Sequence, residues 1–413
     1  MIHLNEDRDT SYSRLSKEMM FARGKATIFL TLLFVLIVGF YRKPDAFLNP
    51  QFWAEDGTIF FNHCLQFGFH SIFLSFVGYF HTIPRLIAYA ASFFPYSIAP
   101  TIYNYSALAA VLVVCAKLFS SRLHLKHKPL FAIAMVLVPY SFLEGFMNIT
   151  NVQFYLAPLL LILFLQDAPR SKYQLCMDFV TLVLIGLTGP FIILSLPLFI
   201  VRCVLNRTPY NYALCFTAIV LVIIQGHEII ITPVDKHLSG DFLYSIDPWI
   251  GLFGFRLFGE MFLGRLISNS INIKILAILS LCYPLLILFL TDFKKDRMYL
   301  VISFLYFGFS VVFAVLYKFR SIPFYLIGQY AGQHYFYVPY LMVMWGLITC
   351  LDSSKIKKRI AIIMLGLMLM SSFTDFQWPA LKDNNWKEYS KQIKPGVPMK
   401  IPTTPRNFFI HIK

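Results

Sequence analysis

Charged residues are scarce in this chain. They make up 14% of its 413 residues, whereas hydrophobic residues make up 58%. A soluble domain normally carries about 25% charged residues, because water has to solvate its surface. The low charge and the mean hydropathy of +0.64 exclude an ordinary soluble protein and favour one that lies in a lipid bilayer.

Patterns that would indicate a disulfide framework or a metal centre are also missing. Six of the seven cysteines lie in or beside apolar runs, where they act as small apolar residues. His63, His70 and His81 share one segment but lack the short spacing of zinc ligands, so we expect no metal. No motif for another cofactor stands out either, and we expect none. No cleavable signal is evident, because the first apolar run follows a charged head and has no small-residue cleavage site after it.

The apolar residues that are present come in runs, such as residues 26–40, 131–138, 156–165 and 275–290. Runs of this kind, bounded by basic or turn residues, are typical of helices that cross a hydrocarbon core about 30 Å thick. Inside lipid each backbone amide has to pair within its own segment, which favours helices. The sequence therefore predicts an all-α polytopic membrane protein.

The net charge of +15 does not indicate a nucleic-acid partner, because the basic residues cluster in short connections between apolar runs. This is the distribution expected of cytoplasmic loops, and it orients the chain. The head, residues 1–25, is then cytoplasmic, and residues 26–372 form the transmembrane domain. Eleven helices are expected near residues 26–41, 99–119, 129–143, 152–166, 173–188, 190–203, 212–230, 272–291, 297–316, 335–351 and 359–372. Periplasmic segments are expected at about 42–98, 231–271 and 317–334 and in the tail, 373–413.

Residues 72–94 are apolar enough to suggest a further crossing, but counting it would invert every later helix. We therefore interpret this segment as outward-side helices that lie along the membrane or dip into it. Almost no ionisable residue falls in the middle of a predicted helix, and the outer segments hold most of the acids outside the head. Because a channel or exporter more often has functional charges at mid-membrane, the working face is expected outside.

The sequence WAEDG at residues 53–57 follows the first predicted helix. Glu55 and Asp56, beside Trp53, suit a general base, since burial and a neighbouring acid would raise one pKa and hold the two carboxyl groups in unlike states. The alternative is a solvated turn, or an acidic helix N-terminus.

Two other segments carry cations. His81 and Arg85 follow Tyr79, and together they suit a lipid phosphate, although an interfacial anchor fits the same residues. Lys318 and Arg320 are further phosphate candidates.

Amide side chains gather at two predicted helix ends. Asn148, Asn151 and Gln153 suit sugar hydroxyl groups, or they simply cap the next helix. Gln333 and His334 open another helix, where an anion, a sugar or an aromatic belt at the membrane surface would fit equally well.

Taken together, these motifs resemble the phage-type, serotype-converting O-antigen glucosyltransferases of bacteria, multipass enzymes related to the GT-C glycosyltransferases. The matching segments are residues 53–57, 81–85, 148–153, 187–190 and 332–339, together with 385–389, 393, 396 and 401–405 of the tail. The resemblance implies transfer of a glucosyl group from undecaprenyl phosphate to an O-antigen sugar at the periplasmic side of the inner membrane.

The resemblance also implies roles for particular residues. Asp56, with Glu55 as second choice, would be the catalytic base, and Arg85 would be the first choice for the donor phosphate. His81, Lys318, Arg320 and His334 follow Arg85 as phosphate candidates. Substrate-binding residues would be Trp53, Tyr79, Asn148, Asn151, Gln153, Gln333 and Trp386.

Two alternatives stay open. An O-antigen polymerase or ligase would also face outward and handle undecaprenyl carriers, but such enzymes usually concentrate arginines in one very large loop. A flippase or transporter would predict inverted halves and broken helices, and no internal repeat is evident here.

Overall fold

The computed structural model describes residues 6–139, 146–232, 250–281, 295–318, 332–374, 376–377, 380–394, 396–405 and 408–412. Within these ranges the chain is mostly helical, and each of the eleven predicted ranges contains a helix. The first part of the chain forms α1 (Glu6–Arg42), α2 (Asp45–Leu48), η1 (Asp56–Phe61), α3 (Asn62–Phe67), η2 (Gly68–Phe73), α4 (Thr82–Ala91), η3 (Tyr96–Ile98) and α5 (Ala99–Leu118).

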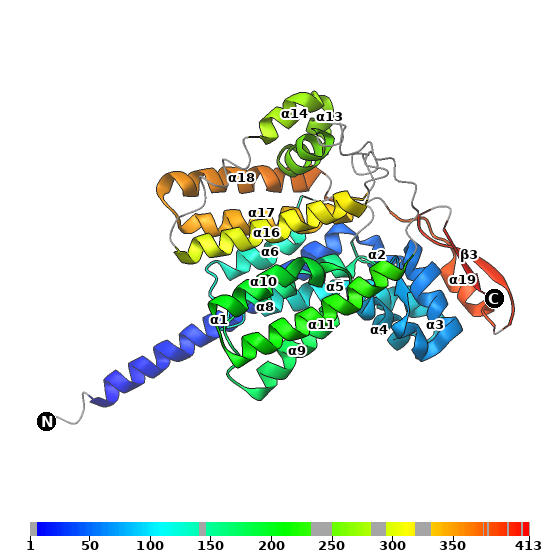
Figure 1. Cartoon of the computed structure of the whole chain (residues 1–413), viewed down its shortest axis with the longest axis horizontal. Coiled ribbons are helices and arrows are strands. Elements are labelled where there is room, and N and C mark those ends of the chain that lie inside the picture. Colours follow the sequence, from blue (N-terminus) through cyan, green and yellow to red (C-terminus); the bar gives the residue numbers. More distant parts are fainter. Residues whose placement is uncertain are drawn as a thin grey trace.

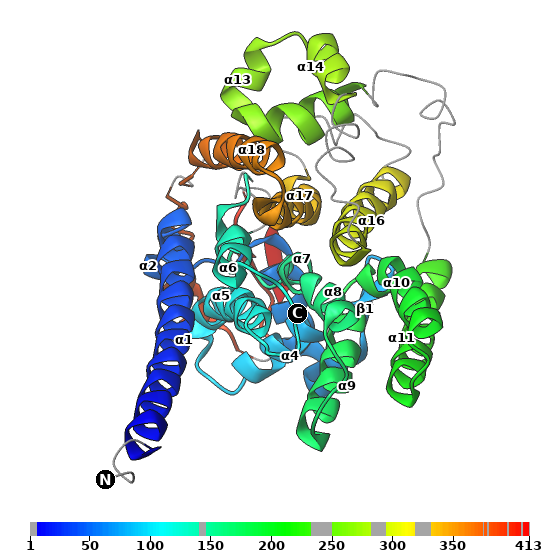
Figure 2. The ribbon, with the colours of Figure 1, turned by 90° about the vertical axis from the view of Figure 1, so that its left-hand side faces the viewer.

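The middle of the chain is also a series of helices. These are α6 (Lys128–Leu137), α7 (Val152–Leu156), α8 (Pro158–Leu165), α9 (Lys172–Gly186), α10 (Phe191–Leu205) and α11 (Pro209–Ile231). The later part contains η5 (Gly251–Leu263), α13 (Gly264–Ser270), α14 (Ile273–Ser280), α16 (Lys295–Lys318), η7 (Gln333–Phe336), α17 (Tyr337–Thr349), η8 (Cys350–Asp352), α18 (Lys355–Thr374) and α19 (Trp386–Gln392). Figure 2 shows α10 and α11 beside α9 at one edge of the helical body, and α1 beside α5 and α6 at the other.

Four helices among the described residues are long and apolar enough to cross a membrane: Gly24–Arg42, Tyr96–Leu118, Pro209–Ile231 and Gln333–Asp352. The predicted count of eleven crossings is not supported. Several predicted spans form short helices, such as α6, whose ten residues extend about 15 Å, half of a hydrocarbon core. Large apolar side chains nevertheless point outward, as Phe216 and Ile230 of α11 do with exposed fractions of 68% and 84%, so the helical body presents the apolar surface expected in a membrane.

Residues 72–94 do not form one long helix. They contain the end of η2, the hairpin of β1 (Ser75–Phe76) with β2 (Tyr79–Phe80), and the ten-residue α4. A helix of this length does not reach across a hydrocarbon core. Within this segment, α4 packs against η2 and α5 at one end of the helical body.

The C-terminal segment folds against this same end. In β3 (Met399–Pro402) and β4 (Phe409–Ile412), an antiparallel pair, Ile401 and Ile410 enter an apolar core with Phe52 and Phe61. Trp386 of α19 completes this second core, which is separate from that of the helical body. Figure 1 shows α2, α3 and α4 beside α19 and β3, far from the N-terminus of α1. We call this assembly, residues 45–98 with 380–412, the cap. The first and last outer segments predicted from the sequence thus lie at the same end of the molecule.

Candidate functional site

A cleft of about 310 Å³ lies where the cap meets the ends of α7 and α16, a volume in the range of small-ligand sites. Residues from well-separated parts of the chain line it: Trp53, Ala54, Glu55, Phe76, Val77, Tyr79, His81, Thr150, Asn151, Gln153, Phe154, Lys318, His334, Tyr335, Pro405 and Phe408. Eight residues predicted from the sequence are among them. The cleft therefore joins segments that lie far apart in the chain, from Trp53 to Phe408.

The two acids of residues 53–57 have different surroundings. Glu55 lines the cleft, and Asp56, the first choice for the base, does not. The carboxylate of Asp56 is fully buried and accepts hydrogen bonds from the main-chain N–H groups of Ile149 (3.1 Å) and Thr150 (2.9 Å) and from Oγ1 of Thr150. Burial raises the pKa of Asp56 to about 7, although the hydrogen bonds from Thr150 and Ile149 act to lower it. Asp56 thus anchors the turn before α7 to η1.

Lys43 lies behind the cleft and was not singled out from the sequence. Its Nζ donates to the carbonyl of Phe146 over 2.9 Å and lies 5.1 Å from the ring centroid of Trp53. Burial lowers the pKa of Lys43 to about 8, while the nearby Asp56 acts to raise it. A cation in this position holds Trp53 as one wall of the cleft. Lys43 follows Arg42 at the end of an apolar helix, and basic residues in this position are equally typical of an interfacial anchor, so the sequence contains no signal for this role.

His81 lines the cleft but is almost fully buried. Its ring stacks on that of Tyr79 at 4.6 Å between centroids, and Nδ1 lies 3.2 Å from the carbonyl oxygen of Tyr79. Burial lowers the pKa of His81 to about 3, so the imidazole is neutral at pH 7. It can therefore form a hydrogen bond with a ligand, but it supplies no positive charge.

Arg85, the first choice for the donor phosphate, does not line the cleft. Its guanidinium is buried and donates to the carbonyls of Ser71 (2.9 Å) and Ser75 (3.4 Å), and it lies 5.4 Å from the ring centroid of Phe60. Arg85 holds the hairpin of the cap to α4. Among the described residues, Lys318 is a cation that does line the cleft, and its Nζ lies 2.9 Å from the hydroxyl of Tyr335.

Only some of the amide side chains of residues 148–153 line the cleft. Asn151 and Gln153 line the cleft, whereas Asn148 is fully buried and accepts from the main-chain N–H of Asn151 over 2.9 Å. Oε1 of Gln153 is buried and has no hydrogen-bond partner among the described residues. An acceptor of this kind at a cleft wall suits a ligand hydroxyl group.

The remaining predicted residues have varied positions. His334 lines the cleft, with its ring 5.1 Å from that of Phe154, and Gln333 is buried beside it without lining the cleft. Trp386 lies in the core of the cap, where its Nε1 donates to the carbonyl of Tyr96 over 2.9 Å. Arg320 lies outside the described residues. No group of metal-binding side chains occurs in the described part of the chain.

Gln225 of α11 is another residue that the sequence analysis missed. It is fully buried, accepts from the N–H of Phe80 (2.8 Å) and donates to the carbonyls of Gly186 and Gly189 (3.1 Å each). It therefore fastens the strand that precedes His81 to the turn after α9. A single glutamine in an apolar helix was the available signal.

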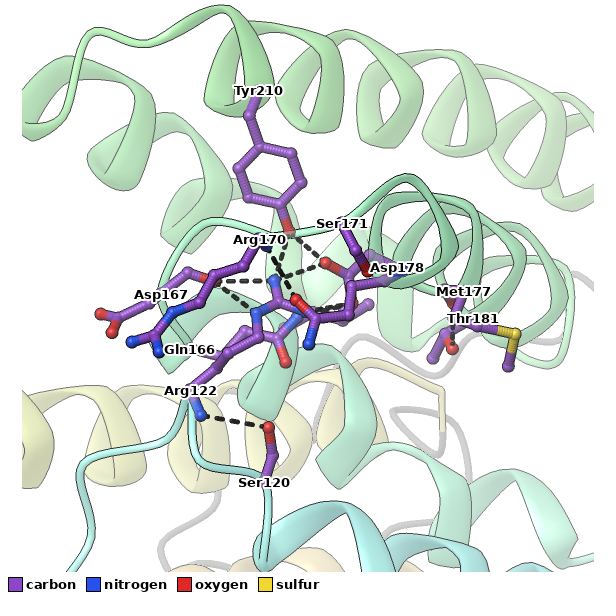
Figure 3. A network of polar contacts seen from close by, with 12 residues as sticks. Ser120, Arg122, Gln166, Asp167, Arg170, Ser171, Met177, Asp178, Thr181 and Tyr210 are labelled. Atoms are coloured by element: carbon purple, nitrogen blue, oxygen red, sulfur yellow. Dashed lines mark hydrogen bonds and ion pairs between the residues drawn. The ribbon is translucent and has the colours of Figure 1, made fainter.

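Buried charge also occurs at the other end of the helical body, where Asp178 is one of the few ionisable residues inside a predicted helix. Asp178 of α9 is fully buried and accepts from Arg122 (2.6 Å), from the hydroxyl of Tyr210 (2.7 Å) and from Nε2 of Gln166 (2.9 Å). Figure 3 shows these side chains converging on Asp178. The network ties the connections at residues 119–127 and 166–171 to α9 and to the first turn of α11.

Comparison with known proteins adds no family: no family model, curated protein or solved structure matches this chain.

Proposed function

We propose that this chain is an inner-membrane glycosyltransferase that moves a glucosyl group from undecaprenyl phosphate to a hydroxyl group of an O-antigen sugar. The observation that carries the proposal is the composition of the cleft. An acid, a cation, amides and aromatic rings meet there, and these groups suit a base, a phosphate and a sugar. The predicted residues among them are Trp53, Glu55, Tyr79, His81, Asn151, Gln153, Lys318 and His334.

Glu55 is the base in this proposal, because it is the acid that lines the cleft. Its carboxylate takes the proton of the acceptor hydroxyl, and the acceptor oxygen attacks the anomeric carbon of the donor. The bond between that carbon and the phosphate oxygen breaks, and undecaprenyl phosphate leaves with the electron pair. Asp56 positions Glu55 by fixing the start of η1 against Thr150.

The leaving phosphate needs a positive charge rather than an acid. Lys318 supplies this charge, since it lines the cleft. The neutral imidazole of His81 does not supply it, because its pKa is near 3. Trp53, Tyr79 and Tyr335 offer aromatic faces to the sugar ring, and Oε1 of Gln153 accepts from one of its hydroxyl groups.

The cleft lies on the periplasmic side in this proposal. Its cap is built from the first and last outer segments predicted from the sequence, whereas Arg122, Lys126 and Lys128 lie at the other end of the helical body. Basic connections of this kind favour the cytoplasm.

The test is the composition of lipopolysaccharide in cells that express the wild type, Glu55→Gln, Asp56→Asn or Lys318→Gln, with membrane levels measured by immunoblot. The matched control is Glu388→Gln, an exposed acid of the cap outside the cleft. We expect Glu55→Gln to lose glucosylation at a normal membrane level, and the control to retain it. A fully active Glu55→Gln protein would refute this base, and an unchanged lipopolysaccharide with the wild type would refute the proposed function.

A further inference from the structure

A second polar pocket, of about 660 Å³, lies at the end of the helical body opposite the cap. It is enclosed by the last residues of α8 and α10, the connection before α11, the connection before α6 and the first turns of α16. Its polar lining residues are His124, Gln166, Asp167, Arg202, Asn206, Thr208, Asn211 and Tyr299. The cleft is lined instead by residues of α7 and by Lys318 at the opposite end of α16, so the two sites are separate.

Arg202 is the cation of this pocket, and its side chain is nearly buried, with 6% exposed. Nε donates to Oδ1 of Asn211 over 2.7 Å, and Nη1 donates to the carbonyls of Leu163 and Phe164. All three acceptors are neutral, and within the described ranges no carboxylate forms an ion pair with Arg202. A buried charge is normally paired. The Nη2 group donates to no described acceptor, so it can serve an anionic ligand.

Two further groups could complete an anion site. The hydroxyl of Tyr299 has no hydrogen-bond partner among the described residues, while its ring packs 5.3 Å from that of Phe164. Gln166 is 99% buried: its Nε2 donates to Asp178, whereas its Oε1 has no partner in the described part of the chain. An unmatched cation, a hydroxyl and an unmatched acceptor therefore meet at one pocket.

We propose that this pocket binds a phosphate ester whose alcohol part carries a hydroxyl group, as in the headgroup of phosphatidylglycerol. Arg202 and Tyr299 bind the phosphate oxygens, and Gln166 accepts from the ligand hydroxyl. Leu165, Leu205 and Leu300 line the same pocket and suit the glyceryl and acyl portion. The one acid of the lining, Asp167, is held at the rim by His124 over 2.7 Å. Basic pockets between helices at the cytoplasmic surface are suited to anionic headgroups. Because this pocket lies at the end of the helical body opposite the cap, it is distinct from the site of the proposed glucosyl transfer.

The test uses the purified full-length protein in nanodiscs of phosphatidylcholine with and without phosphatidylglycerol. Lipid that stays bound after transfer to detergent is measured by native mass spectrometry. The main variant is Tyr299→Phe, which removes only the hydroxyl. The matched control is Tyr306→Phe, two turns further along α16, whose hydroxyl lies 3.1 Å from the carbonyl of Leu194 outside the pocket. We expect Tyr299→Phe to weaken retention of phosphatidylglycerol about tenfold, as for loss of a hydrogen bond to a charged group, and the control to leave it unchanged.

Arg202→Gln should abolish retention, and its thermal stability in phosphatidylcholine alone shows whether the fold survives the loss of the contacts to α8. Inorganic phosphate and glycerol 1-phosphate are added as competitors. Competition by glycerol 1-phosphate at millimolar concentration, but not by inorganic phosphate, would identify a soluble phosphate ester as the ligand. Competition by neither would identify the lipid, and equal competition by both would show that the ligand hydroxyl group is not recognised and would overturn that part of the proposal. Equal retention of the two lipids by the wild type, with no binding of either competitor, would overturn the proposal, as would equal effects of Tyr299→Phe and Tyr306→Phe.

Discussion

The main-chain N–H of Thr150 donates a 2.9 Å hydrogen bond to Oδ1 of Asp56 across a separation of 94 residues. The Thr150 hydroxyl donates to the same oxygen. Thr150 therefore donates two of the three hydrogen bonds that this buried carboxylate accepts from residues 149 and 150. This pair joins the segment after the first helix to the turn before α7, and Glu55 on one side and Thr150 on the other both line the cleft.

Thr150→Val should destabilise the protein by about 1–3 kcal/mol, because it removes one hydrogen bond from a buried charged group. It should also raise the pKa of Asp56 further, since the Thr150 hydroxyl acts to lower it. Thermal unfolding in detergent measures the first effect. The control is Thr181→Val, whose hydroxyl donates only to the carbonyl of Met177 on an exposed surface. Equal melting temperatures of the two variants would contradict a stabilising role of the hydrogen bond from the Thr150 hydroxyl to Asp56.

Asp56 should make stability depend on pH. Its pKa is about 7 in the fold against 3.8 for the free group, so the folded state holds a proton that the unfolded state releases between these values. The contribution is fully present below about pH 4 and is lost as the pH rises toward 7.

His81 acts in the opposite sense. Its pKa falls from 6.5 to about 3, so its contribution grows as the pH rises over that interval. The measurement is therefore the stability of the wild type minus that of Asp56→Asn, in which only the Asp56 contribution is removed. This difference should decrease from pH 4 to pH 7. A difference independent of pH would show that the carboxyl titrates normally.

Gly189→Ala should disrupt the cleft. Gly189 has φ of +85°, and a Cβ atom there would lie 2.1 Å from Oε1 of Gln153. Any L side chain at this position is strained by the backbone angle and displaces a cleft residue. Gly226→Ala is the control, because its Cβ would meet nothing within 4 Å and alanine favours the helix. Glucosylation should be lost only in the first variant, and equal activity of both would contradict the proposed cleft.

Asp178→Asn should destabilise the protein by about 3–5 kcal/mol, because it leaves Arg122 buried without its partner. The ion pair measures 2.6 Å, and the side chains of Arg122 and Asp178 are 3% and 0% exposed. Asp167→Asn provides the comparison, since its side chain is 46% exposed and an exposed pair contributes about 0–1 kcal/mol. Stability is measured by urea unfolding. The same loss of stability in both variants would refute the stabilising role of the Arg122–Asp178 ion pair.

Cysteine labelling tests the orientation. In a cysteine-free background, His124→Cys and Lys391→Cys place a thiol at side chains that are 72% and 67% exposed, at opposite ends of the molecule. A membrane-impermeant maleimide added to spheroplasts should label position 391 and reach position 124 only after lysis. Labelling of position 124 in intact spheroplasts would reverse the proposed orientation.

The sequence singled out segments that line the cleft, but it did not show which residues of each segment face it. Residues 53–57 and 148–153 stood out because polar groups beside apolar spans are unusual, and both segments line the cleft. Which acid faces it depends on the π-helical turn that begins at Asp56, and adjacent residues differ in direction only once that turn is fixed. Arg85 was chosen as a cation next to aromatics, a description that also fits its buried position against Phe60.

Composition by itself determined that the chain is helical and apolar enough for a membrane. The free energy of burying or solvating a side chain depends on the chemistry of that side chain and not on its position in the sequence. Helix lengths were decided locally by proline and by turns, as at Pro158, which separates α7 from α8. Only the tertiary structure brought Asp56 to Thr150, Lys43 to Trp53 and Gln225 to Phe80. These contacts join distant segments, and no periodicity or spacing along the chain encodes them.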